Sequence, residues 1–337
     1  MRGKLFRNNE LYLFIIIVLF SVVITIINPS FLTIENMFDL IKSSSGMAIL
    51  AMGMFIVLLS GGIDVSFTAV AIAGQYVAVN TLIATGVDNL LLAFAISCAV
   101  GVFLGAVNAV FISLFNLPTL ITTLGTLSLF HGALTEFVGT KSINTGQLPD
   151  CFKSFGHMNI LTLTRADGTT YGLSVFALVL LGVIVLSWLI LRYTVLGRGI
   201  YAIGGNYTAA RRGGLNIRFI QFFIYMYVGF LAGIMGVMHL SLIRYSNPNY
   251  IVGTELSVIA AVVIGGSRIT GGSGSILGTI LGVIMIVILE KNLVLIGLSS
   301  YWHQFFIGLI IIVGVSATYI QNRMRSGRSV LAGGMGQ

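Results

Sequence analysis

Four threonines in the apolar stretch 117–138 form the most regular polar pattern of the chain. They are spaced as i, i+3, i+4 and i+7, which places them on one face of a helix: Thr119, Thr122, Thr123 and Thr126. Such hydroxyl groups either bond back to carbonyls of their own helix or line a path for a polar solute. Neighbouring apolar stretches add the amides of Gln75, Asn80 and Asn108. Uncharged hydroxyl and amide groups favour a neutral polyol over an ion as the solute.

Two of the acids within or beside the apolar stretches, Asp64 and Glu290, are candidate functional groups. Asp64 follows the polar stretch 60–63 and precedes an apolar run, which favours a helix N-cap. Glu290 lies deeper, next to Lys291, and an acid at such depth is a candidate functional group unless the helix ends near Leu289. A proton- or sodium-coupled carrier usually shows several ionisable residues near the membrane midplane. The sequence offers almost none, so a cation-coupled carrier is the alternative rather than the main hypothesis.

The residues for several kinds of catalysis are missing from the sequence. It has no G-x-x-x-x-G-K-[ST] motif, and the glycine-rich stretch 271–274 lacks the lysine that reaches nucleotide phosphates. The four histidines are scattered, and no paired acids or serine–lysine pair lies at membrane depth. We therefore expect no metal, cofactor or catalytic residue on this chain, and we expect 271–274 to form a tight turn between two spans.

Composition places these residues in a membrane protein. Of the 337 residues, 57% are hydrophobic and 8% are charged, whereas a soluble domain carries about 25% charged residues. The apolar stretches are continuous, which predicts helices rather than the alternating strands of a barrel. We expect an all-α polytopic fold with ten spans: 11–27, 46–60, 65–84, 90–115, 117–138, 173–191, 219–242, 254–266, 276–296 and 301–320. The stretches 46–60 and 254–266 are short enough to be half-helices.

Basic residues set the expected orientation of these spans. With the N-terminus inside, twelve Lys and Arg residues fall on the cytoplasmic side and six on the outer side, as the positive-inside rule requires. Both termini are therefore expected in the cytoplasm. The long outer loop is about 139–172, and the long inner loop, about 192–218, contains five arginines and no acid. This distribution accounts for the net charge of +8 without a nucleic acid as partner.

Three pairs of glycines lie four residues apart within the apolar stretches. Each pair places two glycines on one helix face, where backbones can approach closely; the pairs are Gly101 and Gly105, Gly229 and Gly233, and Gly278 and Gly282. Packing between helices explains them without any further function.

Three segments together resemble one family of transport proteins, the permeases of ribose-type sugar importers. The segment 55–66, FIVLLSGGIDVS, is similar to the family signature after its second helix. The segment 197–217, GRGIYAIGGNYTAARRGGLNI, resembles the family's cytoplasmic loop between helices six and seven. The segment 255–282, ELSVIAAVVIGGSRITGGSGSILGTILG, resembles its eighth and ninth helices. The order of the segments also fits, so the resemblance covers nearly the whole chain.

The resemblance implies a single permease domain, 1–337, in the bacterial inner membrane, with the helix arrangement of vitamin B12-type importers. It implies three protein partners: a second permease subunit, identical or homologous, a separate ATPase that binds ATP and magnesium, and a periplasmic or lipid-tethered solute-binding protein. The solutes of such permeases include pentoses, galactose and a furanose autoinducer. The chain departs from the family pattern at Phe67-Thr68-Ala69, where many relatives continue with a Ser-Val-Gly-Ser type stretch. If that region contacts the solute, the difference implies a substrate other than ribose.

The inner loop is the expected contact with the ATPase. Gly204-Gly205-Asn206 should break a helix, and a short helix should follow and end at Gly213-Gly214. The resemblance implies that this segment couples the permease to the ATPase, with these residues in the contact: Gly204, Gly205, Asn206, Ala209, Ala210, Arg211, Arg212 and Gly213. The alternative is an anchor whose arginines only contact anionic lipid. A membrane scaffold without transport activity would not need the threonine stripe.

Overall fold

The computed structural model describes residues 9–165, 168, 170–293, 302, 304–306, 308–309 and 312. Most of this part is helical. The long helices are α2 (Asn9–Ile27), α3 (Ile34–Leu59), α4 (Phe67–Thr85), α5 (Leu90–Ser113), α8 (Phe176–Tyr193), α11 (Ile217–Ile243) and α13 (Ile276–Leu293). The shorter elements are η1 (Pro29–Leu32), α6 (Thr119–Ala133), η2 (Leu134–Val138), α7 (Asp150–His157), α9 (Val195–Gly205), α10 (Tyr207–Arg212) and α12 (Glu255–Ile264).

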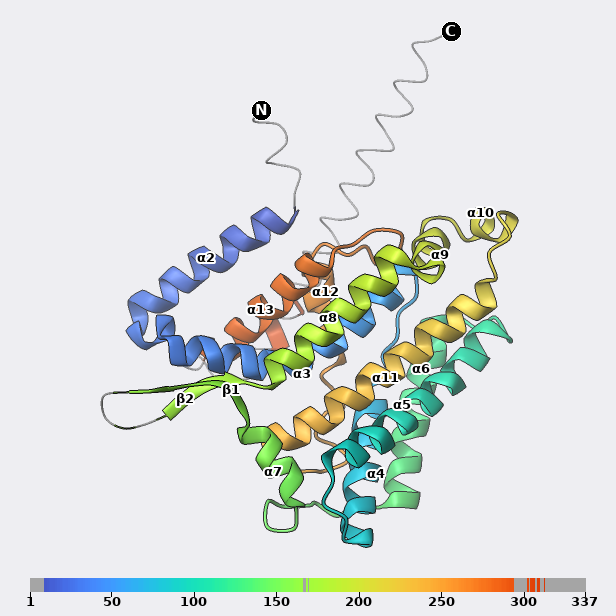
Figure 1. Ribbon diagram of the computed structural model, residues 1–337. Helices are drawn as coiled ribbons and strands as arrows, with labels where there is room; N and C mark the ends of the chain where they lie inside the picture. The colour runs from blue at the N-terminus through green and yellow to red at the C-terminus, as the bar shows by residue number, and fades with distance from the viewer. Residues whose placement is uncertain are drawn as a thin grey trace, which may run out of the picture.

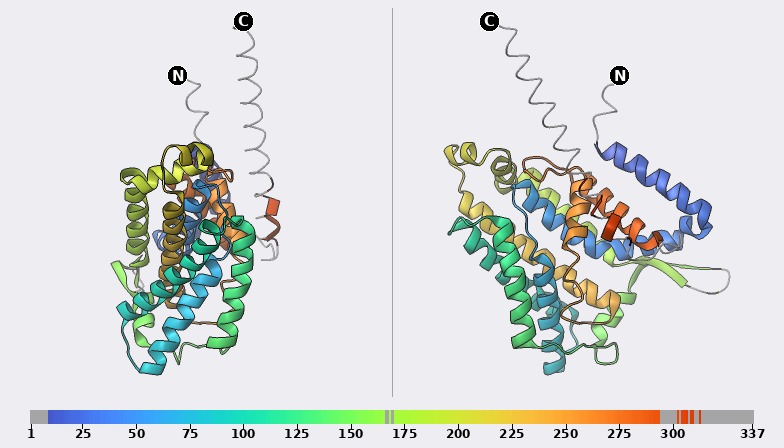
Figure 2. Two further views of the ribbon diagram at one scale, coloured as in Figure 1. Left: turned by 90° about the vertical axis from the view of Figure 1, so that its right-hand side faces the viewer. Right: turned by 180° about the vertical axis from the view of Figure 1, so that it is seen from behind.

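Two helices, α3 and α11, form the centre of the bundle (Figure 1). Helix α11 packs against α5, α4 and α3, and α3 also packs against α8, α12 and α13. From Ala48 to Leu59, every side chain of α3 is buried. Helix α2 packs on α13 at one side, and α6 packs on α4 and α5 at the other. Both views of Figure 2 agree with Figure 1 that α9 and α10 lie at one end of the molecule.

Within the described residues, six helices are long and apolar enough to cross a membrane, namely α2, α3, α4, α5, α8 and α11. The sequence-based boundary of one of them was wrong: the predicted short span 46–60 is the second half of α3, which begins at Ile34. Polar residues obscure its first half in the sequence, but Ser43, Ser44 and Ser45 donate hydrogen bonds to carbonyls of their own helix. Self-bonded hydroxyls leave little polar surface exposed, so the helix can continue.

Two of the other predicted spans are short helices in the structure. Helices α6 and α12 have 15 and 10 residues, so α12 is as short as the sequence suggested. Most of the predicted span 301–320 lies outside the described residues. The chain is thus a mostly helical polytopic membrane protein, and the total of ten spans remains a prediction.

The predicted all-α fold needs one correction, because the predicted outer loop contains a β-hairpin. Strands β1 (Asn159–Thr164) and β2 (Thr170–Ser174) pair antiparallel, with Leu161 opposite Leu173 and Leu163 opposite Tyr171. In the sequence NILTLT, leucines alternate with threonines after a β-branched isoleucine, a pattern that suits a pleated strand. The hairpin projects from the helical bundle (Figure 1), and α7 lies in the same loop just before it.

The three glycine pairs pack as the sequence predicted. Gly101 and Gly105 on α5 face Gly229 and the neighbouring turns of α11, and a Cβ on Gly101 would overlap the carbonyl oxygen of Gly229. A Cβ on Gly229 would in turn overlap the carbonyl oxygen of Gly101. On α13, Gly278 contacts the backbone of Gly265, just after α12. Close backbone contact therefore fixes α5 against α11 and α13 against α12.

Candidate functional site

The helix pair α3–α4 is interrupted by an unwound segment, residues 60–66, which lies against α6. The backbone N–H of Ile63 donates to Thr119 Oγ1 at 3.1 Å, and the N–H of Val65 donates to Thr123 Oγ1 at 3.3 Å. Thr123 Oγ1 also donates to the carbonyl of Ile63, at 3.3 Å. Buried backbone outside a helix needs such partners, since its polar groups are not satisfied within the segment itself. We call residues 60–66 the α3–α4 break.

Asp64 is the acidic residue at the centre of the break and is 2% exposed. Its Oδ1 accepts hydrogen bonds from the N–H and the Oγ of Ser66, both at 2.7 Å. Asn108 Nδ2 on α5 donates to Ser66 Oγ, also at 2.7 Å. The N-cap position of α4 is Ser66 rather than Asp64, so Asp64 organises the start of α4 from two residues upstream. This chain of hydrogen bonds ties the break to α5.

A second polar group lies further along α4. Gln75 Nε2 donates to Ser246 Oγ at 2.9 Å, and Gln75 Oε1 lies 3.2 Å from His239 Nδ1 on α11. Gln75 and Ser246 are buried, so each bond is shielded from water. These contacts hold α4, α11 and the loop after α11 together.

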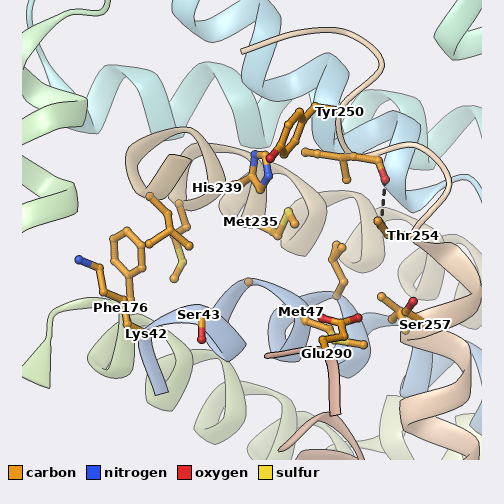
Figure 3. Close-up of a pocket in the computed structure, with 16 residues that line it drawn as sticks. Lys42, Ser43, Met47, Phe176, Met235, His239, Tyr250, Thr254, Ser257 and Glu290 are labelled. Atoms are coloured by element: carbon orange, nitrogen blue, oxygen red, sulfur yellow. Dashed lines mark hydrogen bonds between the residues drawn. The ribbon is translucent and has the colours of Figure 1, made fainter. Parts of the chain in front are cut away.

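A cavity of about 210 Å³ adjoins this second group (Figure 3). Helices α3, α8, α11, α12 and α13 and the loop before α12 line it; its polar and aromatic lining residues are Lys42, Ser43, Phe176, His239, Tyr250, Thr254, Ser257 and Glu290. Figure 3 places Lys42 and Phe176 at one end and Ser257 and Glu290 at the other. Lys42 Nζ donates to the carbonyl of Gly156 on α7 at 2.7 Å. We call this space the outer cavity, because α7 belongs to the predicted outer loop.

The wall of the outer cavity combines polar and apolar groups. Hydroxyls and an imidazole line it together with thioethers and two aromatic rings, and its volume is below the roughly 300–1,000 Å³ of pockets for drug-sized ligands. Lys42 is the one amine and Glu290 the one acid among the described lining residues.

The α9–α10 segment lies at the opposite end of the molecule from α7 (Figure 1). Asn206 separates the two helices, and its Oδ1 caps α10 by accepting from the N–H of Ala209 at 2.9 Å. The predicted helix break and the short helix after it are therefore confirmed. Ala209, Arg211 and Arg212 are exposed, whereas Ala210 is 6% exposed and faces the protein.

A comparison with family models decides what kind of protein this is. The model described as "Branched-chain amino acid transport system / permease component" matches residues 36–315. The chain belongs to this family. It is a multi-pass membrane permease of the bacterial ABC importer type, and its part in such a system is the non-catalytic membrane subunit.

Curated relatives of the permease match it over nearly its full length. The ribose import permease protein RbsC of Escherichia coli (strain K12) is 33% identical over 315 residues, which is 93% of this chain and 94% of that protein. RbsC of Bacillus subtilis (strain 168) is 33% identical, covering 87% and 88%. The autoinducer 2 import system permease protein LsrC of Enterobacter sp. (strain 638) is 31% identical, covering 91% and 86%. No solved structure matches the chain at a significant level.

In the permease, the residues singled out from the sequence fall into separate groups. Thr119, Thr123, Asp64 and Asn108 meet at the α3–α4 break. Thr122 and Thr126 bond to carbonyls of their own helix, and so does Asn80. Gln75 lies with His239, and Glu290 lines the outer cavity. The stripe therefore braces an unwound segment, and its part in a solute pathway stays a prediction.

Sequence reasoning missed several residues that the structure places at these sites. His239, Ser246, Ser257 and Tyr250 lie at or beside the outer cavity or its neighbouring polar group. For His239 a signal existed, since it is the only histidine within the predicted span 219–242. For the others none existed, because serines and tyrosines at span ends are common and only the tertiary structure brings these together.

Proposed function

We propose that the permease carries a small neutral polyol of the monosaccharide class, driven by a partner ATPase. The observation that supports this substrate class is the outer cavity, with its hydroxyls, imidazole and aromatic rings. The names of the relatives RbsC and LsrC, a ribose and an autoinducer 2 import permease, support the same class. The alternative expected from the sequence, a cation-coupled secondary transporter that requires a cation gradient, does not agree with the family match.

The assembly that we propose joins this permease to three protein partners. A solute-binding protein, periplasmic or lipid-tethered, delivers the polyol on the outer side. A second permease, identical or homologous, completes the pathway, and the ATPase holds ATP and magnesium, so that this chain carries no cofactor. The ATPase contacts the exposed side of α10, formed by Ala209, Arg211 and Arg212. The arginines lie in the last turn of α10, with no acid in that helix, and suit carboxylates on the partner.

Reconstitution tests this function. Permease, ATPase and binding protein are placed in liposomes, and uptake of radiolabelled ribose and galactose is measured. We expect uptake that requires internal ATP and continues when ionophores collapse proton and sodium gradients. Uptake by the permease alone, driven by a gradient, would instead establish the secondary transporter.

The same liposomes test the outer cavity. Ser257→Ala removes one hydroxyl from the lining, and a hydrogen bond to a neutral solute contributes roughly 0.5–1.5 kcal/mol. At saturating loaded binding protein we therefore expect uptake to fall about 2–10-fold. The control is Ser128→Ala, because Ser128 Oγ bonds to the carbonyl of Leu124 in its own helix. Equal uptake by both variants would remove Ser257 from the solute's path.

We further propose a single domain, 1–337, with ten spans in a B12-type arrangement and both termini in the cytoplasm. Cysteine labelling tests the orientation. Burial raises the pKa of the Cys151 thiol to about 12, and the Asp88 carboxylate adds to the effect. Since the thiolate is the reactive form, native Cys151 should label slowly at neutral pH, and both native cysteines are replaced by serine for the test.

In that background, an impermeant maleimide should label Gly146→Cys in intact cells and Thr208→Cys only after permeabilisation. Gly146 is exposed, and a Cβ there meets no described atom within 4 Å. Thr208 is exposed and, unlike Asn206, caps no helix. Labelling of position 208 but not 146 in intact cells would reverse the proposed orientation.

A further inference from the structure

Three glycine-containing segments meet at the end of the molecule where α9 lies. They are the α3–α4 break at Gly61, the end of α9 at Gly204, and the α12–α13 turn at Gly271-Gly272. The N–H of Gly272 donates to the carbonyl of Leu59 at 2.9 Å. A Cβ on Gly271 would lie 2.8 Å from the Cα atoms of both Gly204 and Gly61. Segments far apart in the sequence thus touch through their backbones.

Gly204 lies at the centre of this contact. A Cβ there would overlap the carbonyl oxygen of Leu59 and lie 2.5 Å from the nitrogen of Gly272. Gly204 belongs to α9, and its φ is not among the positive ones. Alanine would therefore fit the backbone conformation of Gly204, and the requirement for glycine is one of space alone. The nearest described atoms belong to the backbone, which cannot move aside as a flexible side chain can.

We infer that Gly204 is a positioning residue, through which movement of the α9–α10 segment displaces the α3–α4 break. This inference rests on the proposed docking of α10 to the ATPase. Asn206 joins α10 directly to α9, and the Leu59 carbonyl that Gly204 contacts is only four residues before Ile63. Ile63 and Val65 are held to α6 by hydrogen bonds of 3.1–3.3 Å. Backbone contacts thus connect α10, through α9 and Leu59, to the segment that contains Asp64.

The alternative is that the glycines only allow tight packing. The two hypotheses differ in what alanine changes. If Gly204 only packs, Gly204→Ala lowers stability and reduces every activity of the assembled complex in proportion. If Gly204 transmits movement, the variant assembles with the ATPase, but loaded binding protein no longer stimulates ATP hydrolysis or uptake.

The test compares Gly204→Ala with Gly182→Ala in complexes purified through a tag on the ATPase. Gly182 lies on α8, outside the proposed ATPase contact; it is exposed, and a Cβ there meets no described atom within 4 Å. We expect Gly204→Ala to co-purify with the ATPase and to lose at least about 10-fold in stimulation by loaded binding protein. Gly182→Ala should keep most of the stimulation. Equal stimulation in the two variants would overturn the inference.

If Gly204→Ala does not accumulate, a second pair of variants tests the same inference. Thr119→Val removes the acceptor for the N–H of Ile63 while keeping the side-chain shape. We expect it to co-purify with the ATPase and to lose stimulation several-fold. The control is Thr135→Val, because Thr135 Oγ1 bonds only to carbonyls of its own helix among the described residues. Equal stimulation of these two variants would also overturn the inference.

The controls separate this inference from the proposed function. If the unaltered permease does not co-purify with the ATPase, the proposed function fails. If the unaltered complex imports solute normally and Gly204→Ala does as well, only the role of Gly204 fails.

Discussion

Replacing Gly229 by valine is expected to separate α5 from α11 and to abolish folded permease. The Cβ alone would overlap the carbonyl oxygen of Gly101 and lie 3.3 Å from the Cα of Gly105. Each of these atoms belongs to a helix backbone, so no rotamer change can make room. Overpacking a fitted site costs roughly 1–3 kcal/mol when side chains can shift, and here the cost should reach or exceed the upper value.

The measurement is the amount of monodisperse permease after heating in detergent, followed by fluorescence-detected size-exclusion chromatography. The control is Gly182→Val on α8, which has the same change in helix propensity. Gly182 is exposed, and a Cβ there meets no described atom within 4 Å. A Gly229→Val variant as stable as Gly182→Val would show that α5 and α11 are not held by this contact.

Asp64→Leu is expected to abolish uptake, whereas Asp64→Asn should keep most of it. Leucine leaves the N–H and the Oγ of Ser66 without their acceptor, and an unsatisfied buried donor costs about 1–3 kcal/mol. Asparagine has the same shape and still presents Oδ1 to both donors. The hydrogen bonds that order the start of α4 should therefore persist in the asparagine variant and be lost in the leucine variant.

Uptake in the reconstituted system and thermal stability in detergent are measured together for both variants. If Asp64→Asn is as stable as the unaltered permease but does not transport, then the charge itself is required. That result would assign the carboxylate a part in transport beyond its hydrogen bonds to Ser66. Loss of stability in parallel with uptake in Asp64→Leu alone would support the role of Asp64 in organising the start of α4.

Local rules in the sequence determined those features that depend on neighbouring residues. Continuous apolar stretches predicted membrane helices, because a helix satisfies its own backbone in lipid. The pair Gly229 and Gly233 predicted close helix contact, and the break at Gly204-Gly205-Asn206 with the stop at Gly213-Gly214 predicted a short helix; the structure confirms both. Alternation in NILTLT also marks a strand, and the prediction of an all-α fold missed it.

Only the tertiary structure decided what the polar side chains bond to. The spacing of Thr119 and Thr123 defines one helix face, but whether that face meets solute or protein depends on the α3–α4 break, some sixty residues away. The local sequence around Asp64 suggests a helix cap, and only packing brings Asn108 to the same network. The contact of Gly204 with Leu59 likewise joins distant segments. Hydrogen bonds and backbone contacts between distant residues follow from three-dimensional packing, which periodicity along one helix does not specify.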